Sequence, residues 1–474
     1  MTVSLNHLFR GAVAAALVFA ATAANAVNLS SDGNGEALIY PYYSVRGGQV
    51  TLVSVVNNDS RSKALNVVFR EARNATAVLE FNLFLSNSDV WTAAIVADAS
   101  GGAKLISSDA SCTNPRIPTA GVSFSNVGYA SDSPSFRSLD RTTEGYFEIV
   151  ELASIVSKSA IDIDVTQNGS GERTCLLVSN SSVVARQSEF EAPRGKLSGT
   201  ATLVSRSMST GYSALALQGL HIPVTSMADS RSFYVLGLAN ARSKTAFITH
   251  AAPKRTYTIF AEFDRSIDAI SAVLMQDKVR GEFSKETGFA TDFVMTFPTK
   301  FFYANAGNAG TAGNPFTSRW NPDTGAACEV PDGPNFRSRE QGVPGFFDGA
   351  MPRTTLCFST TTLSFVSSGT SSPLGSSVRA EIVEPPAGIE PRFRPVTGTA
   401  SLGLGRGTQP DLLSNANSRV IVTESGAATR EINGAVKFSG LPVIGIVIST
   451  LQATNTNSSF NSSYALTGSR ALPE

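Results

Sequence analysis

Residues 35–97 alternate between apolar and polar side chains, and this alternation constrains the fold more than any other feature of the chain. In the segment 65–70, Leu65, Val67 and Phe69 occupy every second position, and the segment 79–85 repeats in the same way. Successive side chains of a strand point to opposite faces, so each segment has one apolar face. Turns rich in Asn and Asp separate the segments. The stretch therefore predicts an antiparallel meander with one buried and one solvated face.

Residues 1–26 have the three parts of a secretory signal peptide. Arg10 precedes a short apolar run, and Ala24, Asn25 and Ala26 form a small-residue cleavage site. The apolar run is shorter than the ~20 residues that a membrane-spanning helix needs. We therefore expect export with cleavage after Ala26, to the periplasm, the cell surface or the extracellular space. We expect no transmembrane segment in the chain that remains.

The charge of the chain argues against nucleic acid as a partner. The 38 basic residues balance the 38 acidic residues, and the sequence contains no basic run. Nucleic-acid binding normally requires such a patch, because the phosphates must be neutralised. Charged residues make up only 16% of the chain, below the usual quarter, as in a β protein with many uncharged turns.

The alternating pattern continues through the rest of the 474 residues. We predict a mainly β fold with two antiparallel β-sandwich domains, immunoglobulin-like or jelly-roll-like, and one or a few short helices. The first domain spans 27–194, and the second spans 195–474 and carries long loops. The Pro and Gly residues around 192–195 suggest the boundary.

Four segments of the second half are assigned individually. We expect strands at 233–239 and 441–451, and a pair of aromatic strands at 293–303. A helix is expected after Ser266, which can cap it, because Ile267, Ile270 and Leu274 follow at helical spacing, and Gly281 can end it.

The four cysteines of the chain predict two disulfides. An even number of cysteines in an exported chain favours disulfide bonds. Their order alone allows three pairings, and we favour Cys112–Cys175 with Cys328–Cys357 because each pair closes within one half of the chain. The sequence contains no C-x-x-C spacing, which disfavours a cysteine metal site.

A group of carboxylates on the segment 144–151 is the main candidate for catalysis. Glu144, Glu148 and Glu151 lie close in sequence, and a pair of carboxylates can serve as acid and base in glycoside hydrolysis. On a strand, however, Glu148 and Glu151 point to opposite faces, so a solvated strand face followed by a turn is favoured over a catalytic pair. Aromatic side chains near such a site would contact a sugar, and the candidates are Tyr146, Trp91 and Trp320.

Other motifs give no stronger site. The segments 162–164 and 168–172 contain oxygen ligands of the kind that Ca²⁺ prefers, but Glu172 comes too early for an EF-hand loop, and a polar turn is favoured. After residue 26 only His221 and His250 remain as histidines, and the sequence has no G-x-S-x-G, H-E-x-x-H or P-loop motif. We expect no cofactor and no metal, and an enzyme is less favoured than a binding protein.

Several segments together resemble a known group of sequences. They are GEALIYPYYSVRGG, TLVSVVNND, FREARNATAVLEFNLFLSNSDVWTA, EGYFEIVE, TDFVMTFPTKFFY and LPVIGI. This set is similar to uncharacterised exported or cell-surface proteins of Gram-negative proteobacteria. The resemblance implies an exported β-rich fold and assigns no functional residue.

Two functions are compatible with these patterns. The first is a non-catalytic protein of the periplasm or cell surface that acts in binding, adhesion or assembly, including strand addition between copies of itself. Its partners would be other surface proteins, a surface polymer or further copies. The second is a protein that binds carbohydrate or a surface polymer, with carboxylate-based hydrolysis as an extension.

Overall fold

The computed structural model describes residues 26–178, 186–224, 237–305, 314–339, 353–367, 370–383, 396–405, 411–424, 429–452 and 459–470. The predicted signal peptide lies outside these residues except for Ala26. Most of the predicted strand at 233–239 also lies outside them, and residues 237–239 belong to the 3-10 turn η7 (Gly237–Asn240). The described part of the chain is mainly β with antiparallel sheets and short helices, as the sequence predicts.

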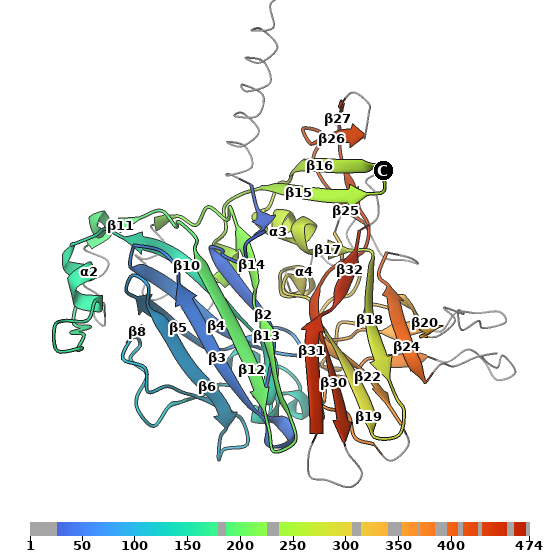
Figure 1. The fold of residues 1–474 in the computed structure, drawn as a ribbon, viewed down its shortest axis with the longest axis horizontal. Coiled ribbons are helices and arrows are strands. Elements are labelled where there is room, and N and C mark those ends of the chain that lie inside the picture. The colour runs from blue at the N-terminus through green and yellow to red at the C-terminus, as the bar shows by residue number, and fades with distance from the viewer. Residues whose placement is uncertain are drawn as a thin grey trace, which may run out of the picture.

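Two sheets face each other in the first sandwich (Figure 1). The larger sheet has the order β1 (Asn28–Leu29), β14 (Leu215–Gln218), β2 (Ala37–Ser44), β10 (Glu144–Ile155), β4 (Lys63–Glu71), β5 (Ala77–Leu85) and β8 (Cys112–Asn114), and β11 (Phe190–Glu191) pairs with β10. The smaller sheet has the order β13 (Ser209–Ser213), β12 (Leu197–Val204), β3 (Val50–Asn57), β6 (Val90–Ala97), β7 (Ala103–Ile106) and β9 (Val122–Ser123).

Alternation within these strands produces the core of the first sandwich. Leu65, Val67 and Phe69 of β4 are all fully buried in it, in agreement with the predicted apolar face. Phe69 stacks on Phe147 of β10 with ring centroids 4.9 Å apart. Strands β4 and β10 are buried on their second face as well, so the predicted solvated face of β4 is in fact covered.

The first sandwich extends beyond the predicted boundary at 194 and 195. Strand β12 pairs with β3 over its whole length, from Leu197 opposite Asn57 to Val204 opposite Val50. Strand β14 pairs with β2 and β1. The sheets therefore place the end of the first sandwich after Gln218, because the strands that follow the Pro–Gly segment complete its edges.

The second sandwich is built from the C-terminal half. One sheet has the order β23 (Glu381–Val383), β21 (Arg353–Thr355), β20 (Asp332–Ser338), β24 (Thr397–Gly403), β18 (Lys278–Ser284) and β32 (Thr467–Ser469). The other has the order β22 (Thr360–Val366), β19 (Phe289–Thr296), β30 (Ile444–Gln452) and β31 (Ser459–Ala465). Val294, Ile446 and Ile448 of this second sheet are buried in the core of the first sandwich, so the two sandwiches contact each other.

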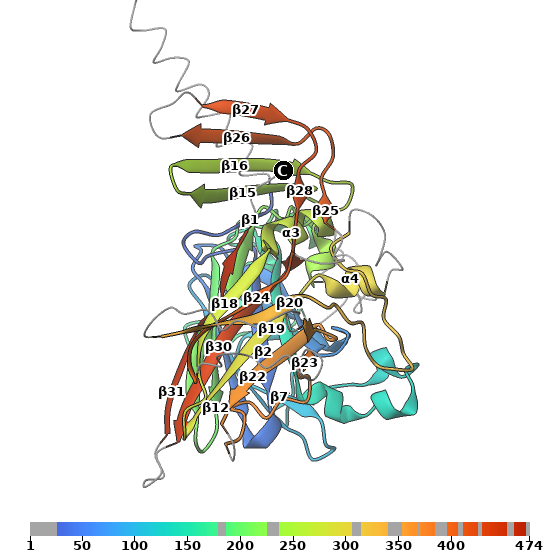
Figure 2. The ribbon, with the colours of Figure 1, turned by 90° about the vertical axis from the view of Figure 1, so that its right-hand side faces the viewer.

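A further sheet lies above both sandwiches, and its strands run across those below it (Figure 2). Its order is β15 (Thr245–Ala252), β16 (Arg255–Glu262), β26 (Arg419–Glu424) and β27 (Arg430–Asn433). Two short pairs complete the described strands, namely β17 (Met275–Gln276) with β29 (Leu441–Pro442) and β25 (Leu412–Leu413) with β28 (Lys437–Phe438). We call the four-stranded sheet of β15, β16, β26 and β27 the upper sheet.

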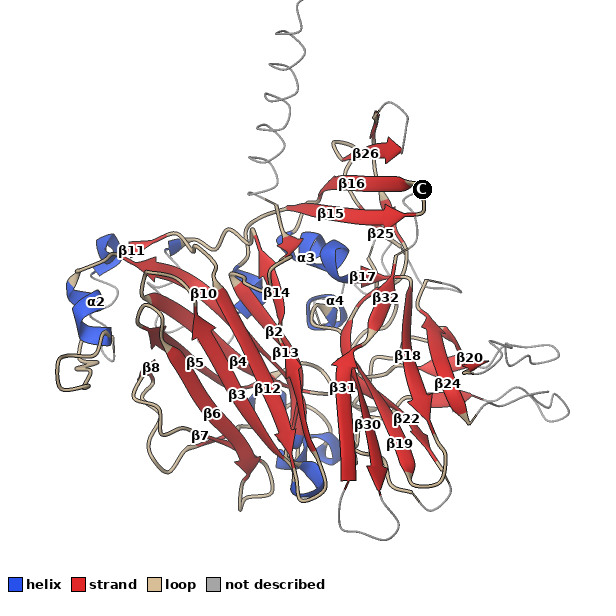
Figure 3. Ribbon diagram, in the orientation of Figure 1, coloured by secondary structure: helices blue, strands red, loops and turns tan. Residues whose placement is uncertain are grey.

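The helices are short and lie between or beside the sheets (Figure 3). They are α2 (Ala160–Val165), α3 (Ser266–Leu274) and α4 (Lys300–Ala304), with 3-10 turns at η1 (Arg46–Gly48), η2 (Val127–Tyr129), η3 (Pro134–Phe136) and η4 (Leu139–Thr143). In the described part of the chain, none of the helices has the length and apolar character to cross a bilayer.

Two of the sequence predictions for this region are wrong in part. Helix α3 forms as predicted, but Ser266 is its first residue and Arg265 is the N-cap, without a side-chain cap bond. The helix ends at Leu274, and Gly281 lies inside β18. A Cβ at Gly281 would come within 2.7 Å of the ring of Phe293, so this glycine allows close packing of two sheets and does not end a helix. The predicted aromatic strand at 301–303 is the helix α4, because Pro298 lacks the N–H that would continue a ladder.

Both disulfides join the cysteines that the sequence predicts. Cys112 is bonded to Cys175 and Cys328 to Cys357, with sequence separations of 63 and 29 residues.

The predicted strand at 441–451 forms as the short strand β29 followed by β30. Strand β30 is internal and lies between β19 and β31.

Candidate functional site

The carboxylates that the sequence suggests for catalysis are enclosed in the structure. Glu144 is 1% exposed and accepts hydrogen bonds from the Tyr42 hydroxyl at 2.9 Å and the Ser376 hydroxyl at 2.7 Å. The Ser377 backbone N–H donates to it at 2.8 Å. Burial raises the pKa of Tyr42 well above its usual value, so its hydroxyl stays a donor. Glu144 therefore ties the loop that contains Ser376 to the first sandwich.

Glu148 has a comparable structural role on the same strand. It is 0% exposed, and Arg70 donates to it from Nε at 3.0 Å. The backbone N–H of Leu238 donates to its second oxygen at 3.1 Å. A Cβ on Gly237 would lie 2.5 Å from that oxygen, so the chain passes directly over the carboxylate. Glu144 and Glu148 are thus both buried and hydrogen-bonded to protein groups within the described part of the chain.

The aromatic candidates are also tied to internal partners. The Tyr146 hydroxyl donates to the Pro298 carbonyl at 3.2 Å, between the two sandwiches. Trp320 donates from Nε1 to Asp132 at 3.3 Å, beside the buried Arg141. Neither residue lies with the two glutamates in one open site.

Trp91 differs because it borders an open depression. The side chain is 1% exposed, and it packs on Phe81 with ring centroids 5.9 Å apart. It also lines a cleft of about 690 Å³ next to the Cys112–Cys175 disulfide. We call this the disulfide cleft. Its other lining residues include Asp109, Arg116, Glu172 and Arg173.

Contacts within the disulfide cleft order its charged rim. Arg173 forms an ion pair with Asp89 at 2.5 Å and is 4% exposed at the side chain. Asp109 accepts from the backbone N–H of Thr92 at 3.2 Å and of Ser111 at 2.8 Å. Asp164, from the segment considered as a calcium ligand, instead accepts backbone N–H groups of residues 176–178. Among the described residues no group of three His, Cys, Asp or Glu side chains could hold a metal ion.

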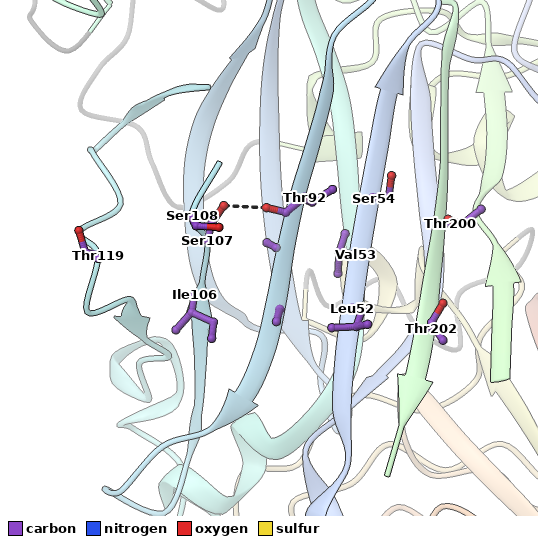
Figure 4. A pocket seen from close by; sticks show the side chains of 12 residues that line it. Leu52, Val53, Ser54, Thr92, Ile106, Ser107, Ser108, Thr119, Thr200 and Thr202 are labelled. Carbon is purple, nitrogen blue, oxygen red and sulfur yellow. Dashed lines mark hydrogen bonds between the residues drawn. The ribbon is translucent and has the colours of Figure 1, made fainter. Parts of the chain in front are cut away.

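An open trough on the outer face of the smaller sheet continues from the cleft (Figure 4). Its volume is about 510 Å³, and Ser107, Ser108 and Thr119 line both depressions. Strands β12, β3, β6 and β7 form its floor, and all its lining residues are uncharged. The lining residues are Leu52, Val53, Ser54, Thr92, Ala93, Ala94, Ile106, Ser107, Ser108, Thr119, Thr200 and Thr202.

The strand register arranges these side chains in two rows across the sheet. Ser213, Thr200, Ser54 and Thr92 are direct neighbours on β13, β12, β3 and β6, which gives a row of hydroxyl groups. Neighbouring strands are about 4.8 Å apart, so the hydroxyls repeat at that spacing. Ser107 donates to the Thr92 carbonyl at 2.6 Å and holds the end of the row.

The second row lies beside the first and is mostly apolar. Thr202, Leu52, Ala94 and Ile106 are direct neighbours on β12, β3, β6 and β7. Leu52 is 45% exposed, so its side chain is accessible in the trough. The trough thus offers a band of hydroxyls alongside a band of methyl groups.

Sequence reasoning missed this trough, although one signal for it was present. Ser198, Thr200 and Thr202 alternate along 197–204, and a strand with hydroxyls on one face and apolar residues on the other has a polar but uncharged surface. The neighbours Ser54 and Thr92 join this row only through the pairing of distant strands, which the sequence does not reveal.

A buried lysine near the second disulfide has a structural role. Lys300 is 2% exposed, and its Nζ donates to the carbonyls of Ala327 at 2.6 Å, Leu356 at 3.3 Å and Phe358 at 3.4 Å. Burial lowers the pKa of Lys300 to about 8. The ammonium thus fixes the chain on both sides of Cys328–Cys357, far from the trough in sequence.

The lowered pKa of Lys300 makes stability depend on pH. In the unfolded chain the pKa is about 10.4, so the unfolded state binds more protons between about pH 8 and 10.4, and the free energy of unfolding rises with pH there. From the lower to the upper end of this pH range, the free energy of unfolding of wild type should rise by roughly 2–3 kcal/mol relative to that of Lys300→Met. Urea unfolding at a series of pH values measures this difference. The exposed Lys244→Met is the control and should show no such gain. A constant difference between wild type and Lys300→Met would contradict the assignment.

Comparisons of the chain with protein-family models, with curated proteins and with solved structures found no match.

Proposed function

We propose that the protein is an exported, non-catalytic binding protein that holds an uncharged, hydroxyl-rich polymer such as a neutral polysaccharide. The observation that carries the proposal is the pair of rows in the trough. A sugar ring has hydroxyls at its edge and C–H groups on its faces, and the trough offers hydroxyls in one row and Leu52, Ala94 and Ile106 in the next. Each serine or threonine hydroxyl can both donate and accept, as a sugar hydroxyl does.

The absence of charge in the lining favours a neutral ligand. None of the trough residues is a lysine, arginine or histidine that would attract sulfate, phosphate or uronate groups. The open shape of the trough, with exposed Thr92 and Thr200, suits a chain that lies along the sheet more than a small molecule that needs enclosure. Export and two disulfides agree with a ligand outside the cytoplasm.

Hydrolysis and self-assembly have less support. The glutamates considered for hydrolysis have buried protein partners, as described above. Strand addition between copies would use a free edge such as β27, but this edge carries Arg430 and Glu431, and charges on an edge disfavour pairing with a further strand.

The trough can be tested with arginine substitutions. We expect Thr92→Arg and Thr200→Arg each to weaken binding of neutral polysaccharide at least about tenfold, because the long charged side chain blocks both rows. Gels that contain neutral or acidic polysaccharides measure this as retardation of the folded protein. Both positions are exposed, so the free energy of unfolding should change by no more than about 0.5 kcal/mol.

Thr249→Arg on the upper sheet is the matched control. Thr249 is also an exposed strand threonine, but it lies outside the trough. Its retardation should equal that of wild type. If wild type is retarded by no neutral polysaccharide, or if Thr249→Arg loses retardation to the same extent, the proposed function is wrong.

A further inference from the structure

The residues on both sides of the predicted cleavage point are packed inside the folded protein. Ala26 and Val27 are both 0% exposed. The Val27 backbone N–H donates to the Thr245 carbonyl at 2.8 Å, and the Phe247 N–H donates to the Val27 carbonyl at 2.8 Å. Val27 thereby forms a parallel bridge with Ala246 of the upper sheet.

The next residues bind a different sheet. Asn28 and Leu29 form β1, which pairs with β14 at the edge of the first sandwich. The first residues after the cleavage point thus connect the first sandwich to the upper sheet. This connection is made by backbone hydrogen bonds, so it depends on the position of the chain and not on one side chain.

A narrow slot receives Ala26 and Val27. Gly219 forms one wall and has a φ of +71°, a conformation that favours glycine. A Cβ there would lie 2.1 Å from the Ala26 carbonyl oxygen and 3.3 Å from the Val27 nitrogen. Glu36 fixes this wall, since it accepts from the backbone N–H of Gly219 at 3.1 Å and of Leu220 at 2.9 Å.

We propose that removal of residues 1–26 converts Val27 into a buried N-terminal anchor between the first sandwich and the upper sheet. The proposal rests on the export proposed above. Hydrolysis breaks the bond between the Ala26 carbonyl carbon and the Val27 nitrogen. Water supplies the hydroxyl group to the carbon and a proton to the nitrogen, and the released peptide leaves with residues 1–26.

The new α-amino group has partners in the slot. It keeps the Thr245 carbonyl as an acceptor, because the Val27 nitrogen already donates to it. Asn28 Nδ2 now donates to the Ala26 carbonyl at 2.9 Å, and that acceptor leaves with the peptide. Rotation of the Asn28 amide presents its oxygen to the amine instead.

Chemical labelling of the terminal amine tests the anchor. Two chains are prepared by cleavage of an N-terminal fusion, one that begins at Val27 and one that begins at Ala24. Both are treated with an amine-acylating reagent at neutral pH. At this pH the α-amino group reacts faster than lysine, because its pKa is lower. We expect the Val27 amine to react at least about tenfold more slowly in the folded protein than in guanidinium. A tenfold difference corresponds to about 1.4 kcal/mol for the equilibrium between the buried and the exposed amine. The Ala24 amine should react at similar rates in both. Equal rates for the two folded chains would overturn the proposal.

A second measurement tests the slot itself. Gly219→Ala introduces the same backbone strain into both chains, but its Cβ meets the Ala26 carbonyl only in the longer chain. The melting temperature should therefore fall further in the Ala24 chain than in the Val27 chain, and an equal fall would contradict the slot.

Sequencing of the N-terminus of the protein from producing cells distinguishes a failure of the proposed export from a failure of the proposed anchor. A chain that begins at Met1 overturns export and the anchor together, whereas a Val27 chain with a reactive amine overturns the anchor alone.

Discussion

Replacement of Glu151 by glutamine is expected to lower the free energy of unfolding by about 3–5 kcal/mol. Glu151 and Lys63 are both 0% exposed, and their charged atoms are 2.9 Å apart. The Glu151 carboxylate also accepts from the Ser154 hydroxyl at 2.7 Å and the Gly195 N–H at 2.9 Å. The amide keeps the shape of the carboxylate but leaves the Lys63 ammonium with Asp59 as its remaining ion-pair partner among the described residues. Urea unfolding followed by circular dichroism measures the change.

Two further variants distinguish the loss of the buried ion pair from a general effect of Glu→Gln substitution on stability. Glu191→Gln is the control, because Glu191 forms a half-exposed pair with Arg61 at 4.0 Å, and the expected loss is below about 1 kcal/mol. The double variant Lys63→Met with Glu151→Met should be more stable than Glu151→Gln, because both members of the fully buried pair are removed and Asp59 keeps Arg194 as a partner at 3.3 Å. A loss of less than about 1 kcal/mol for Glu151→Gln would show that water reaches the pair and that the network contributes little.

The sequence predicted the features that depend on local pattern. Strand β4 was predicted from the alternation of Leu65, Val67 and Phe69, since a period of two determines which side chains share a face. The order of the cysteines allows three pairings, and the preference for pairs that close within one half of the chain selected the two bonds that form. The presence of α3 followed from the apolar stripe after Ser266, although its N-cap is Arg265.

Features that depend on contacts between distant segments were not predictable. Glu148 looked like a half-solvated strand residue, but residues 237 and 238 cover it from far along the chain. Gly281 looked like a helix end, and only its distance to Phe293 shows that it permits two sheets to pack. The hydroxyl row of the trough likewise requires that Thr200 and Thr92 flank Ser54, which the register of three distant strands determines.

Removal of the Cys112–Cys175 disulfide is expected to affect both stability and binding. The double variant Cys112→Ala with Cys175→Ala should lower the free energy of unfolding by roughly 4 kcal/mol, because the bond closes a loop with a separation of 63 residues in the unfolded chain. Both cysteines also line the disulfide cleft, which shares Ser107 and Ser108 with the trough. Binding of neutral polysaccharide should therefore weaken even at temperatures where the variant is folded.

The second disulfide is the matched control for this effect. Cys328→Ala with Cys357→Ala should cost roughly 3.5 kcal/mol by the same argument for a separation of 29 residues, but neither cysteine lines the trough or the cleft. We therefore expect a similar loss of stability without a loss of binding, measured on both variants by urea unfolding and by gel retardation. If both double variants lose binding equally, the loss reflects general destabilisation. If neither does, the cleft has no part in recognition and the ligand is held by the rows of the trough alone.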